Sequence, residues 1–268
     1  MDGIEASRSE KTGKKTLASP SPVVVVRMGR GRTGGSTALD WIVQIARHQG
    51  RSVVVADGDK RNPTLAGLYP PGTPGGALQP LSEESPDVVA WINDCLASVA
   101  SDRVSLVLDL GGGDRVLAEV ANDWPIVEFC EQRGIQTLAI YVCGPDQDDF
   151  EHILSIHRAG YFRAARCVLI LNEHLVPRGK TPAGAFDAIL ARTEFLDLVE
   201  SGMQAVVMPR LACMDHVRAA GLSLMDAVAN EPGLNGKRLD PVRQFQVENW
   251  HKRMTEAFHN VGALEWLP

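Results

Sequence analysis

The chain has 268 residues and a formal net charge of −6, and charged residues make up 22% of it. This length fits one large α/β domain with short extensions and is enough to bury a substantial core. The acidic balance excludes a protein that coats nucleic acid with its whole surface, although it is compatible with a local basic patch. No uninterrupted apolar run approaches the ~18–20 residues of a membrane span.

The first 21 residues and the cysteines both favour a cytoplasmic protein. The tail carries charge, serine and glycine but lacks the apolar core of a secretory signal, and its composition predicts disorder. The five cysteines are scattered, and no two of them form a C-x-x-C pair. We therefore expect neither a disulfide framework nor a zinc site.

The stretch from Val23 to Thr37 has the order strand, glycine-rich loop and helix. Val23–Val26 is a β-branched apolar run typical of a buried strand. A glycine-rich turn follows from Gly29 to Gly35, and Ser36 and Thr37 then begin a segment with apolar residues on one helical face. In this context backbone N–H groups and the positive end of a helix converge on an anion.

This loop matches the phosphate-binding pattern G-x-x-x-x-G-K-[ST] except at its lysine. The pattern aligns with Gly29, Gly34, Gly35 and Ser36. Glycine therefore stands at position 35, where the pattern has lysine, and Arg30 and Arg32 are the cations within the loop. The loop alone is equally compatible with a plain glycine-rich turn between a strand and a helix.

Two further strands end in acids. Residues 51–59 (RSVVVADGD) form an apolar strand that ends in Asp57 and Asp59, at the edge where open α/β sheets bind ligands. Because this strand follows the helix after the loop, we expect it to pair directly with the first strand. Val104–Asp109 is a third apolar strand, and glycines from Gly111 onward follow its terminal acid. This is the Walker B pattern, in which the carboxylate reaches a Mg²⁺ shell.

The remaining elements continue the alternation of strands and helices. Helical spacing is present at 87–100 and 150–159, and three more strands are expected at Thr137–Cys143, Arg166–Leu171 and Gln204–Met208. The Pro- and Gly-rich stretch at 70–86 is typical of a surface loop. The pattern predicts an α/β fold with a doubly wound, mainly parallel sheet and helices on both faces. Apolar residues at helical spacing over 240–261 predict a terminal helix docked on the core, and a partner-binding or membrane-surface helix is the alternative.

Together these motifs resemble the ParA/MinD-type ATPases, the deviant Walker A branch of the SIMIBI class of P-loop proteins. The family loop, K-G-G-x-G-K-[ST]-T, matches residues 30–37, and its D-x-D strand end matches residues 57–59. Val104–Asp109 matches the Walker B strand, and Asn172 matches an adenine-contacting asparagine. A closing pattern of strand, proline and helix matches residues 208–223. Residues 30–37 and 57–72 look most similar to the TraL/StbB-like proteins of plasmid transfer and stability.

The resemblance implies three units and a site for ATP and Mg²⁺. The units are a disordered tail (1–21), a P-loop NTPase-like domain (22–230) and a C-terminal helical extension packed on it (231–268). The residues placed at the nucleotide are Gly29, Gly31, Arg32, Thr33, Gly34, Gly35, Ser36, Thr37, Asn172 and Pro209. Ser36, Asp57 and Asp109 would serve the magnesium ion, and Asp59 would orient the attacking water. Arg30, at the signature lysine position, would act across a nucleotide-dependent homodimer, and plasmid DNA or a DNA-bound adaptor would be the further partner.

The departures from the family pattern affect catalysis more than fold. Arg30 keeps the charge of the signature lysine and could act as an arginine finger. Gly35 removes the cation that stabilises the β- and γ-phosphates, and Arg32 stands where the family has glycine. Arg32 could reach back over the phosphates, but a guanidinium needs a different geometry from an ammonium. Slow ATP hydrolysis, or none, is therefore expected.

Three functions remain open from the sequence. The first is a nucleotide switch in plasmid partition, stability or conjugal transfer. The second is a non-hydrolysing adaptor on the same fold that binds protein or DNA. The third is a P-loop enzyme of small-molecule metabolism, which the seven histidines do not favour because they lack metal-binding spacing. Lys11–Lys15 and the arginines at 158, 163 and 166 are candidate DNA-binding patches, and a solvated surface is the alternative for each.

Overall fold

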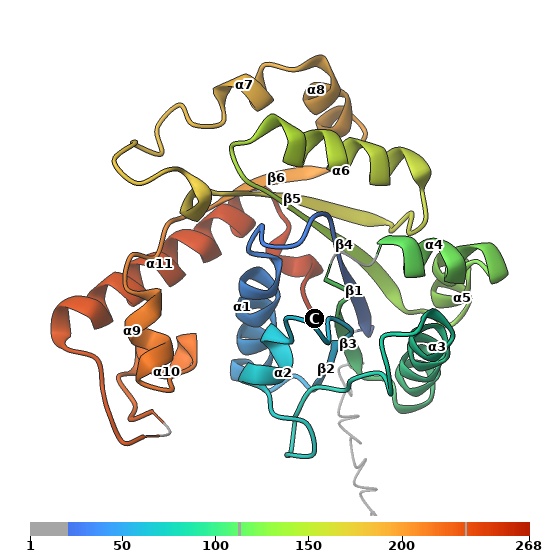
Figure 1. The fold of residues 1–268 in the computed structure, drawn as a ribbon, viewed down its shortest axis with the longest axis horizontal. Helices are drawn as coiled ribbons and strands as arrows, with labels where there is room; N and C mark the ends of the chain where they lie inside the picture. Colours follow the sequence, from blue (N-terminus) through green and yellow to red (C-terminus); the bar gives the residue numbers. More distant parts are fainter. Residues whose placement is uncertain (1–20, 112–113, 234) are drawn as a thin grey trace, which may run out of the picture.

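A six-stranded parallel sheet forms the centre of the molecule, in the order β2-β3-β1-β4-β5-β6 (Figure 1). The structure is a computed structural model that describes residues 21–111, 114–233 and 235–268. The strands are β1 (Val23–Met28), β2 (Val53–Asp57), β3 (Ser105–Asp109), β4 (Gln136–Cys143), β5 (Arg166–Asn172) and β6 (Gln204–Met208). All five pairs of neighbours are parallel. The predicted doubly wound α/β fold is confirmed.

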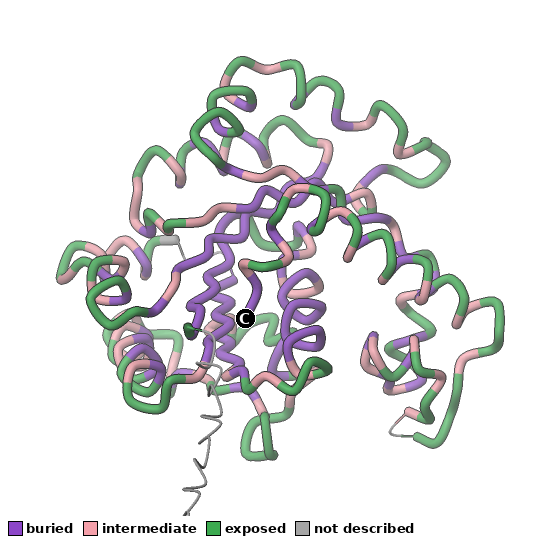
Figure 2. Tube along the Cα trace, turned by 180° about the vertical axis from the view of Figure 1, so that it is seen from behind, coloured by how far each residue is buried: buried purple, intermediate pink, exposed green. Residues whose placement is uncertain are grey.

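Helices cover both faces of the sheet. They are α1 (Gly35–His48), α2 (Thr64–Leu68), α3 (Ser85–Asp102), α4 (Asp114–Asp123), α5 (Ile126–Gln132), α6 (Gln147–Ala159), α7 (Asp187–Leu190), α8 (Thr193–Glu200), α9 (Met214–Ala219), α10 (Leu224–Ala229) and α11 (Pro241–Asn260). Val23 and Val25 belong to the core beneath α1, α10 and α11, whereas Val24 and Val26 belong to the core beneath α3 and α6. This alternation follows from the period of two in a strand. Figure 2 shows the buried strands running between the two helical layers.

The order of the strands corrects one expectation. We predicted that the strand ending in Asp57 would pair with the first strand, and this is wrong because β3 lies between β1 and β2. The connection from β1 through α1 leads to β2 and leaves a gap of one strand beside β1. The connection from β2 through α3, on the other face of the sheet, then places β3 in that gap. Two right-handed connections running in opposite directions must use opposite faces. As a result, Asp57 and Asp109 are register partners at the ends of neighbouring strands.

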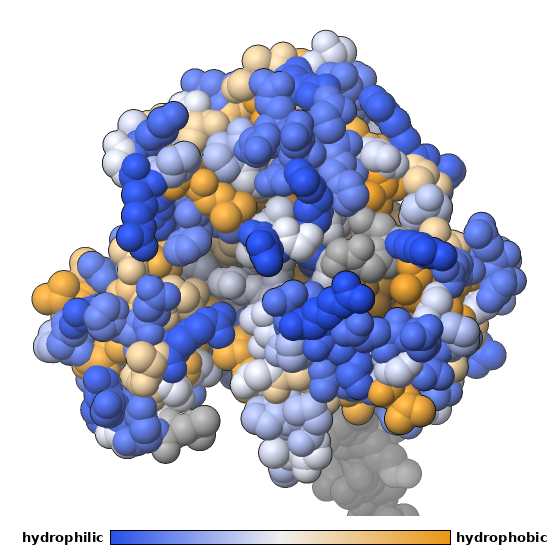
Figure 3. All heavy atoms as spheres, viewed as in Figure 1, coloured by the Kyte–Doolittle hydropathy of each residue, from blue (hydrophilic) through white to orange (hydrophobic). Residues whose placement is uncertain are grey.

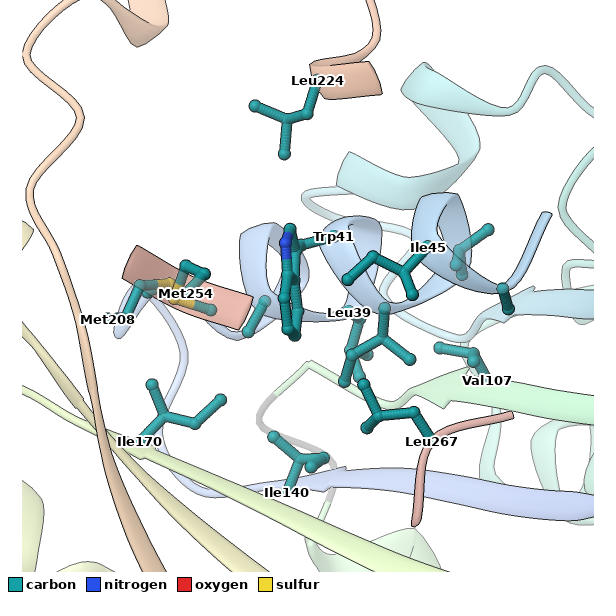
Figure 4. Packing of buried hydrophobic residues seen from close by; sticks show 14 of the residues in the cluster. Leu39, Trp41, Ile45, Val107, Ile140, Ile170, Met208, Leu224, Met254 and Leu267 are labelled. Atoms are coloured by element: carbon teal, nitrogen blue, oxygen red, sulfur yellow. The ribbon is translucent and has the colours of Figure 1, made fainter. Parts of the chain in front are cut away.

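The C-terminal helix α11 packs against α1, as expected of a terminal helix that docks on the core. Its buried residues are Val247, Trp250, Met254 and Phe258. The rings of Phe258 and Trp41 lie 4.9 Å apart between centroids, and Figure 4 shows Trp41 projecting from α1 into a cluster that includes Met254 and Met208. Val242 and Phe245 do not join this stripe, because each is 67% exposed. The boundary at residue 231 stays a prediction.

On the face of the molecule seen in Figure 3, apolar residues form separate small patches among hydrophilic ones. Within the described ranges, no helix is both long enough and apolar enough to cross a membrane. The predicted surface loop at 70–86 is largely free of helix and strand, apart from a bridge between Leu78 and Ala56 and the first two residues of α3. The expected disordered tail and the basic stretch Lys11–Lys15 lie outside the described residues, Ser21 excepted.

Candidate functional site: a glycine-rich loop between β1 and α1

The loop that joins β1 to α1 has a backbone that only partly suits side chains. Gly29, Arg32 and Gly34 have φ angles of 116°, 67° and 90°, all in the left-handed region that favours glycine. Gly34 also lies so close to the amide of Asn172 that a Cβ there would overlap its Nδ2. Glycine at position 34 is therefore required both by its φ angle and by the contact with Asn172. The backbone N–H groups of the loop and of the first turn of α1 are then available to an anion.

Ser36 and Asp109 are brought together at the mouth of this loop. The Ser36 hydroxyl donates to Asp109 Oδ2 at 2.6 Å, and Asp109 Oδ1 accepts from the backbone N–H of Gly111 at 2.9 Å. Asp109 is buried at the carboxyl end of β3. Two residues predicted to serve a magnesium ion are therefore in contact, since β1 and β3 are neighbours in the sheet, and their role at a metal ion stays a prediction.

Asp57 lies next to Asp109, at the end of β2. Its Oδ2 accepts from the N–H of Ala66 at 2.9 Å, and its Oδ1 accepts from the N–H of Asp59 at 3.1 Å. Burial, together with the negative charges of Asp109 and Asp59, raises the pKa of Asp57 to about 6. Two carboxyl groups at adjacent strand ends thus form an acidic edge that would favour a bound cation.

Asp59, in the loop after β2, lines a cleft beside the glycine-rich loop. Its carboxyl group lies over Gly111, where a Cβ would come within 2.8 Å of Asp59 Cγ. Gly111 also has a φ angle of 63°, so its glycine is required by both contact and backbone conformation. The cleft has a volume of about 830 Å³. Among its lining residues are the predicted site residues Gly31, Arg32, Gly34, Gly35, Ser36, Thr37 and Asp59.

Arg27, on β1, lies at the candidate site although the sequence did not lead us to expect it there. Its side chain is 4% exposed and lines the same cleft. Its guanidinium donates to the carbonyl oxygens of Gly111 and Arg30, and to Thr33 Oγ1 at 3.0 Å. A signal was present in the sequence, because a charged residue stands within an apolar strand directly before a loop that lacks its lysine.

The two arginines that were predicted to serve the phosphates, Arg30 and Arg32, are both exposed. Arg30 Nη1 lies 3.3 Å from Asp149 Oδ1 on α6, and the Arg30 side chain is half-exposed. Arg30 and Thr33 line a second cleft of about 1050 Å³, on the side of the loop that faces residues 175–185. Gly29 lines neither of these clefts, since it packs against Val142 and Ile153.

Asn172 and Pro209 lie on the far side of the loop, next to a small cavity of about 120 Å³. The buried Asn172 amide donates to the carbonyl of Thr33 at 2.8 Å, and its oxygen accepts from the N–H of His174 at 2.9 Å. The Pro209 carbonyl accepts from Trp250 Nε1 at 2.7 Å. In this structure Asn172 therefore holds the loop in place, and its role as an adenine contact stays a prediction.

The donor set fits a phosphate group with a magnesium ion. A helix N-terminus and a buried guanidinium suit an anion, while a hydroxyl and carboxylates are the oxygen ligands that Mg²⁺ takes. Within the part of the chain that the structure describes, no group of three or more His, Cys, Asp or Glu side chains could hold a metal ion by itself. A magnesium ion here would therefore share its shell with phosphate oxygens and water.

Comparisons with known proteins add a distant likeness of fold. No protein-family model matches the sequence, and no curated protein matches it. Chloroplast FtsY from Physcomitrella patens is 13% identical with a TM-score of 0.45, and the match covers 90% of this chain and 68% of that one. The signal recognition particle receptor FtsY from Elizabethkingia anophelis is 13% identical with a TM-score of 0.48, covering 87% and 66%. Cell division protein FtsY from Thermotoga maritima is 16% identical with a TM-score of 0.44, covering 87% and 70%.

These values concern the arrangement of the chain only, and the chain spans about two thirds of the length of the proteins it matches. The chemistry of the site rests on its own residues. The chain itself has a parallel sheet, a glycine-rich loop after β1, and an acid at the end of the neighbouring β3 that contacts Ser36.

Proposed function

We propose that this protein binds a magnesium nucleoside triphosphate in the cleft between β1 and α1 and acts as a nucleotide-dependent switch. The observation that carries the proposal is the hydrogen bond from Ser36 Oγ to Asp109 Oδ2 at the end of a glycine-rich loop. In P-loop proteins a serine or threonine of the loop and an acid of the neighbouring strand hold the magnesium ion. Both groups are present here, in contact, at the N-terminus of a helix.

The phosphates would be held mainly by the backbone. The N–H groups at the start of α1 have no side-chain cap, and the first turn of this helix carries no acidic residue. These donors and the helix dipole therefore remain available to an anion. Ser36 and Asp109 would hold the magnesium ion, with Asp57 behind them. The ion would neutralise charge on the phosphates when bound.

Hydrolysis would depend on Asp59. This side chain lines the cleft and is fixed at one oxygen by the N–H of Asn62, at 3.0 Å. It is the group we assign to orienting a water molecule. Without a lysine at position 35, charge stabilisation at the phosphates is weaker, and turnover would be slow.

The finer proposal follows the sequence resemblance to ParA/MinD-type ATPases. The protein would use ATP, form a homodimer when ATP is bound, and act in plasmid partition, stability or conjugal transfer on DNA or a DNA-bound adaptor. The order of the loop, the two acidic strand ends and Asn172 along the chain supports this assignment. Arg30 would be the residue that reaches the partner subunit, and its exposure supports such a role.

A non-hydrolysing adaptor is the alternative, and one observation favours it. The donors of Arg27 that are bonded in this structure contact the chain itself, at Arg30 and Thr33 of the glycine-rich loop and at Gly111 after β3. A loop already tied together in this way could keep its shape without nucleotide. In that case the protein would present the fold to a protein or DNA partner and would not change with ATP.

Sedimentation of the full chain distinguishes the two functions. The sample would be measured without nucleotide, with Mg·ADP, with Mg·ATP and with Mg·GTP, and thermal unfolding would be followed in parallel. A ligand at about 100 times its Kd stabilises the folded state by about 2.7 kcal/mol, so binding raises the melting temperature. ATP-dependent dimerisation supports the switch, whereas an unchanged mass and an unchanged melting temperature support the adaptor.

A further inference from the structure

Arg27 is a buried cation without a counter-ion. Its side chain is 4% exposed, and none of the described residues forms an ion pair with it. The hydrogen bonds it makes are to two carbonyl oxygens and one hydroxyl, all uncharged. Its Nε is buried and has no hydrogen-bond partner. A buried charge is unfavourable unless it is paired, so this arrangement favours an anion that the chain itself does not supply.

The acid that faces Arg27 on the neighbouring strand does not fill this role. Arg27 and Asp109 are register partners on β1 and β3, yet the carboxylate of Asp109 is bonded to Ser36 and to the N–H of Gly111. Arg27 borders the cleft of about 830 Å³ whose lining includes Gly34, Gly35 and Ser36. An anion held by the loop would therefore lie within reach of the guanidinium.

The position of Arg27 also explains the glycine at position 35. A Cβ built on Gly35 would overlap Arg27 Nε and would lie 2.9 Å from both Cδ and Cζ of Arg27. The Arg27 side chain thus occupies the space at the start of α1 that a lysine at position 35 would need. The two cations exclude each other, since the arginine enters from the strand and the lysine would enter from the helix.

We propose that Arg27 is the phosphate-binding cation of this protein. It takes the place of the lysine that the phosphate-binding pattern has at position 35, where this chain has glycine. This inference rests on the proposed function, because it assigns a residue to the same cleft. The guanidinium is always charged and carries five N–H donors, so it can hold the loop with some of them and a phosphate with others. Arg27 and Gly35 then act as a pair, and changing one of them requires a change in the other.

The first test compares Arg27→Gln with Arg51→Gln. Arg51 is a matched control because its Nε is also buried without a partner, while its Nη1 donates to the Leu267 carbonyl far from the loop. Calorimetry would use Mg·ATP and, as a probe without a base, magnesium tripolyphosphate. We expect Arg27→Gln to weaken both affinities by about 10- to 100-fold, the usual effect of losing a charged hydrogen bond, and Arg51→Gln to leave both within about twofold.

The second test exchanges the two cations. Gly35→Lys alone should abolish binding of tripolyphosphate, because its side chain overlaps Arg27. The double variant Arg27→Val, Gly35→Lys frees the space and supplies the charge from the helix. We expect it to regain an affinity within about 10-fold of the wild type. An arginine that only stabilised the loop would not permit this rescue, so failure of a folded double variant to bind contradicts the proposal.

The outcomes distinguish a failure of the role given to Arg27 from a failure of the proposed nucleotide-binding function. If the wild type binds and folded Arg27→Gln binds equally well, the role of Arg27 is wrong while the proposed function stands. If the wild type binds neither probe, the proposed function itself is wrong. Should the variants not fold, the Arg27 side-chain N–H resonance of the ¹⁵N-labelled wild type decides: tripolyphosphate should shift it and leave that of Arg51 unchanged, and an unshifted Arg27 resonance contradicts the proposal.

Discussion

The hydroxyl of Ser36 lies 2.6 Å from Asp109 Oδ2, and this bond joins the first turn of α1 to the end of β3. The same two oxygens would face a magnesium ion between the helix and the sheet. The other carboxylate oxygen of Asp109, Oδ1, accepts from the N–H of Gly111 directly after β3. The relationship therefore links the fold of the sheet to the chemistry proposed for the cleft.

Removing the Ser36 hydroxyl should affect nucleotide binding only when magnesium is present. Ser36→Ala is expected to weaken the affinity for Mg·ATP by about 10-fold, since one ligand and one hydrogen bond to a charged group are lost. The affinity for ATP in the presence of a chelator should not change. Calorimetry with and without magnesium measures both values, and an equal loss under the two conditions would argue against a magnesium role for Ser36.

Adding a methyl group at position 35 should destabilise the protein. Gly35→Ala places a Cβ against the Arg27 guanidinium, and such overpacking costs about 1–3 kcal/mol. Gly67→Ala is the control, because nothing lies within 4 Å of its added Cβ in α2, and alanine there should be neutral or slightly stabilising. Urea unfolding gives both free energies. Equal stability of the two variants would show that Arg27 moves aside without cost.

Binding should weaken in acid because of Asp57. The pKa of its carboxyl group is raised to about 6 by burial and by the charges of Asp109 and Asp59. Below about pH 6 Asp57 therefore becomes neutral, and the acidic edge loses attraction for magnesium. The affinity for Mg·ATP, measured from pH 5 to pH 8, should fall below pH 6 in the wild type, and Asp57→Asn should not show this fall. A parallel fall in both proteins would assign it to another group.

The same group has the opposite effect on folding. The unfolded carboxyl group titrates near 3.8 and the folded one near 6, so between these values the folded state holds more protons. The contribution of Asp57 to stability is therefore most favourable below pH 3.8. It decreases as the pH rises to about 6 and is constant above that. Ligand-free unfolding measured across this window, with Asp57→Asn as the reference, checks the sign.

Two phenylalanines of α11 should differ sharply in their effect on stability. Phe258 is fully buried against Trp41, and its replacement by alanine should lower the free energy of unfolding by about 3–5 kcal/mol. Phe245 is 67% exposed on the same helix, and Phe245→Ala should change it by less than about 0.5 kcal/mol. Chemical denaturation of both variants tests whether the C-terminal helix is part of the folded domain. Similar small losses would show that α11 contributes little.

Asp59 distinguishes hydrolysis from binding. Asp59→Asn keeps an oxygen that can accept from the N–H of Asn62 but removes the charge assigned to orienting water. We expect the affinity for Mg·ATP to remain close to that of the wild type and slow ATP turnover to be lost. Phosphate release and sedimentation measure the two consequences. If Asp59→Asn leaves both turnover and dimerisation unchanged, the switch hypothesis is wrong.

Much of the fold could be predicted because its strands are continuous apolar runs. Val23–Val26 are buried on both faces, and in β2 Val53 and Val55 are buried while Val54 is partly buried; such runs are visible in the sequence without knowledge of their neighbours. The position of β3 between β1 and β2 could not be derived, because pairing depends on which face each connecting helix takes. The short helices α7, α9 and α10 also lack a long periodic pattern.

The candidate site was predicted where its residues are close together in the chain or end a strand. Ser36 and Asp109 were identified in this way, and β1–β3 pairing brought them into contact. Arg27 was missed because its role depends on two carbonyl groups and one hydroxyl group from the glycine-rich loop and from the segment after β3, and its neighbours in the chain are apolar. The contact of Asn172 with Thr33 likewise joins residues 139 positions apart and has no local signal.

Calorimetric titration of the wild-type full chain with Mg·ATP tests the central claim most directly. We expect saturable binding that weakens when magnesium is removed, together with competition by magnesium tripolyphosphate, since the phosphates are the recognised group. Absence of binding at millimolar concentrations of both ligands would contradict it, and the glycine-rich loop would then be a structural turn held together by Arg27.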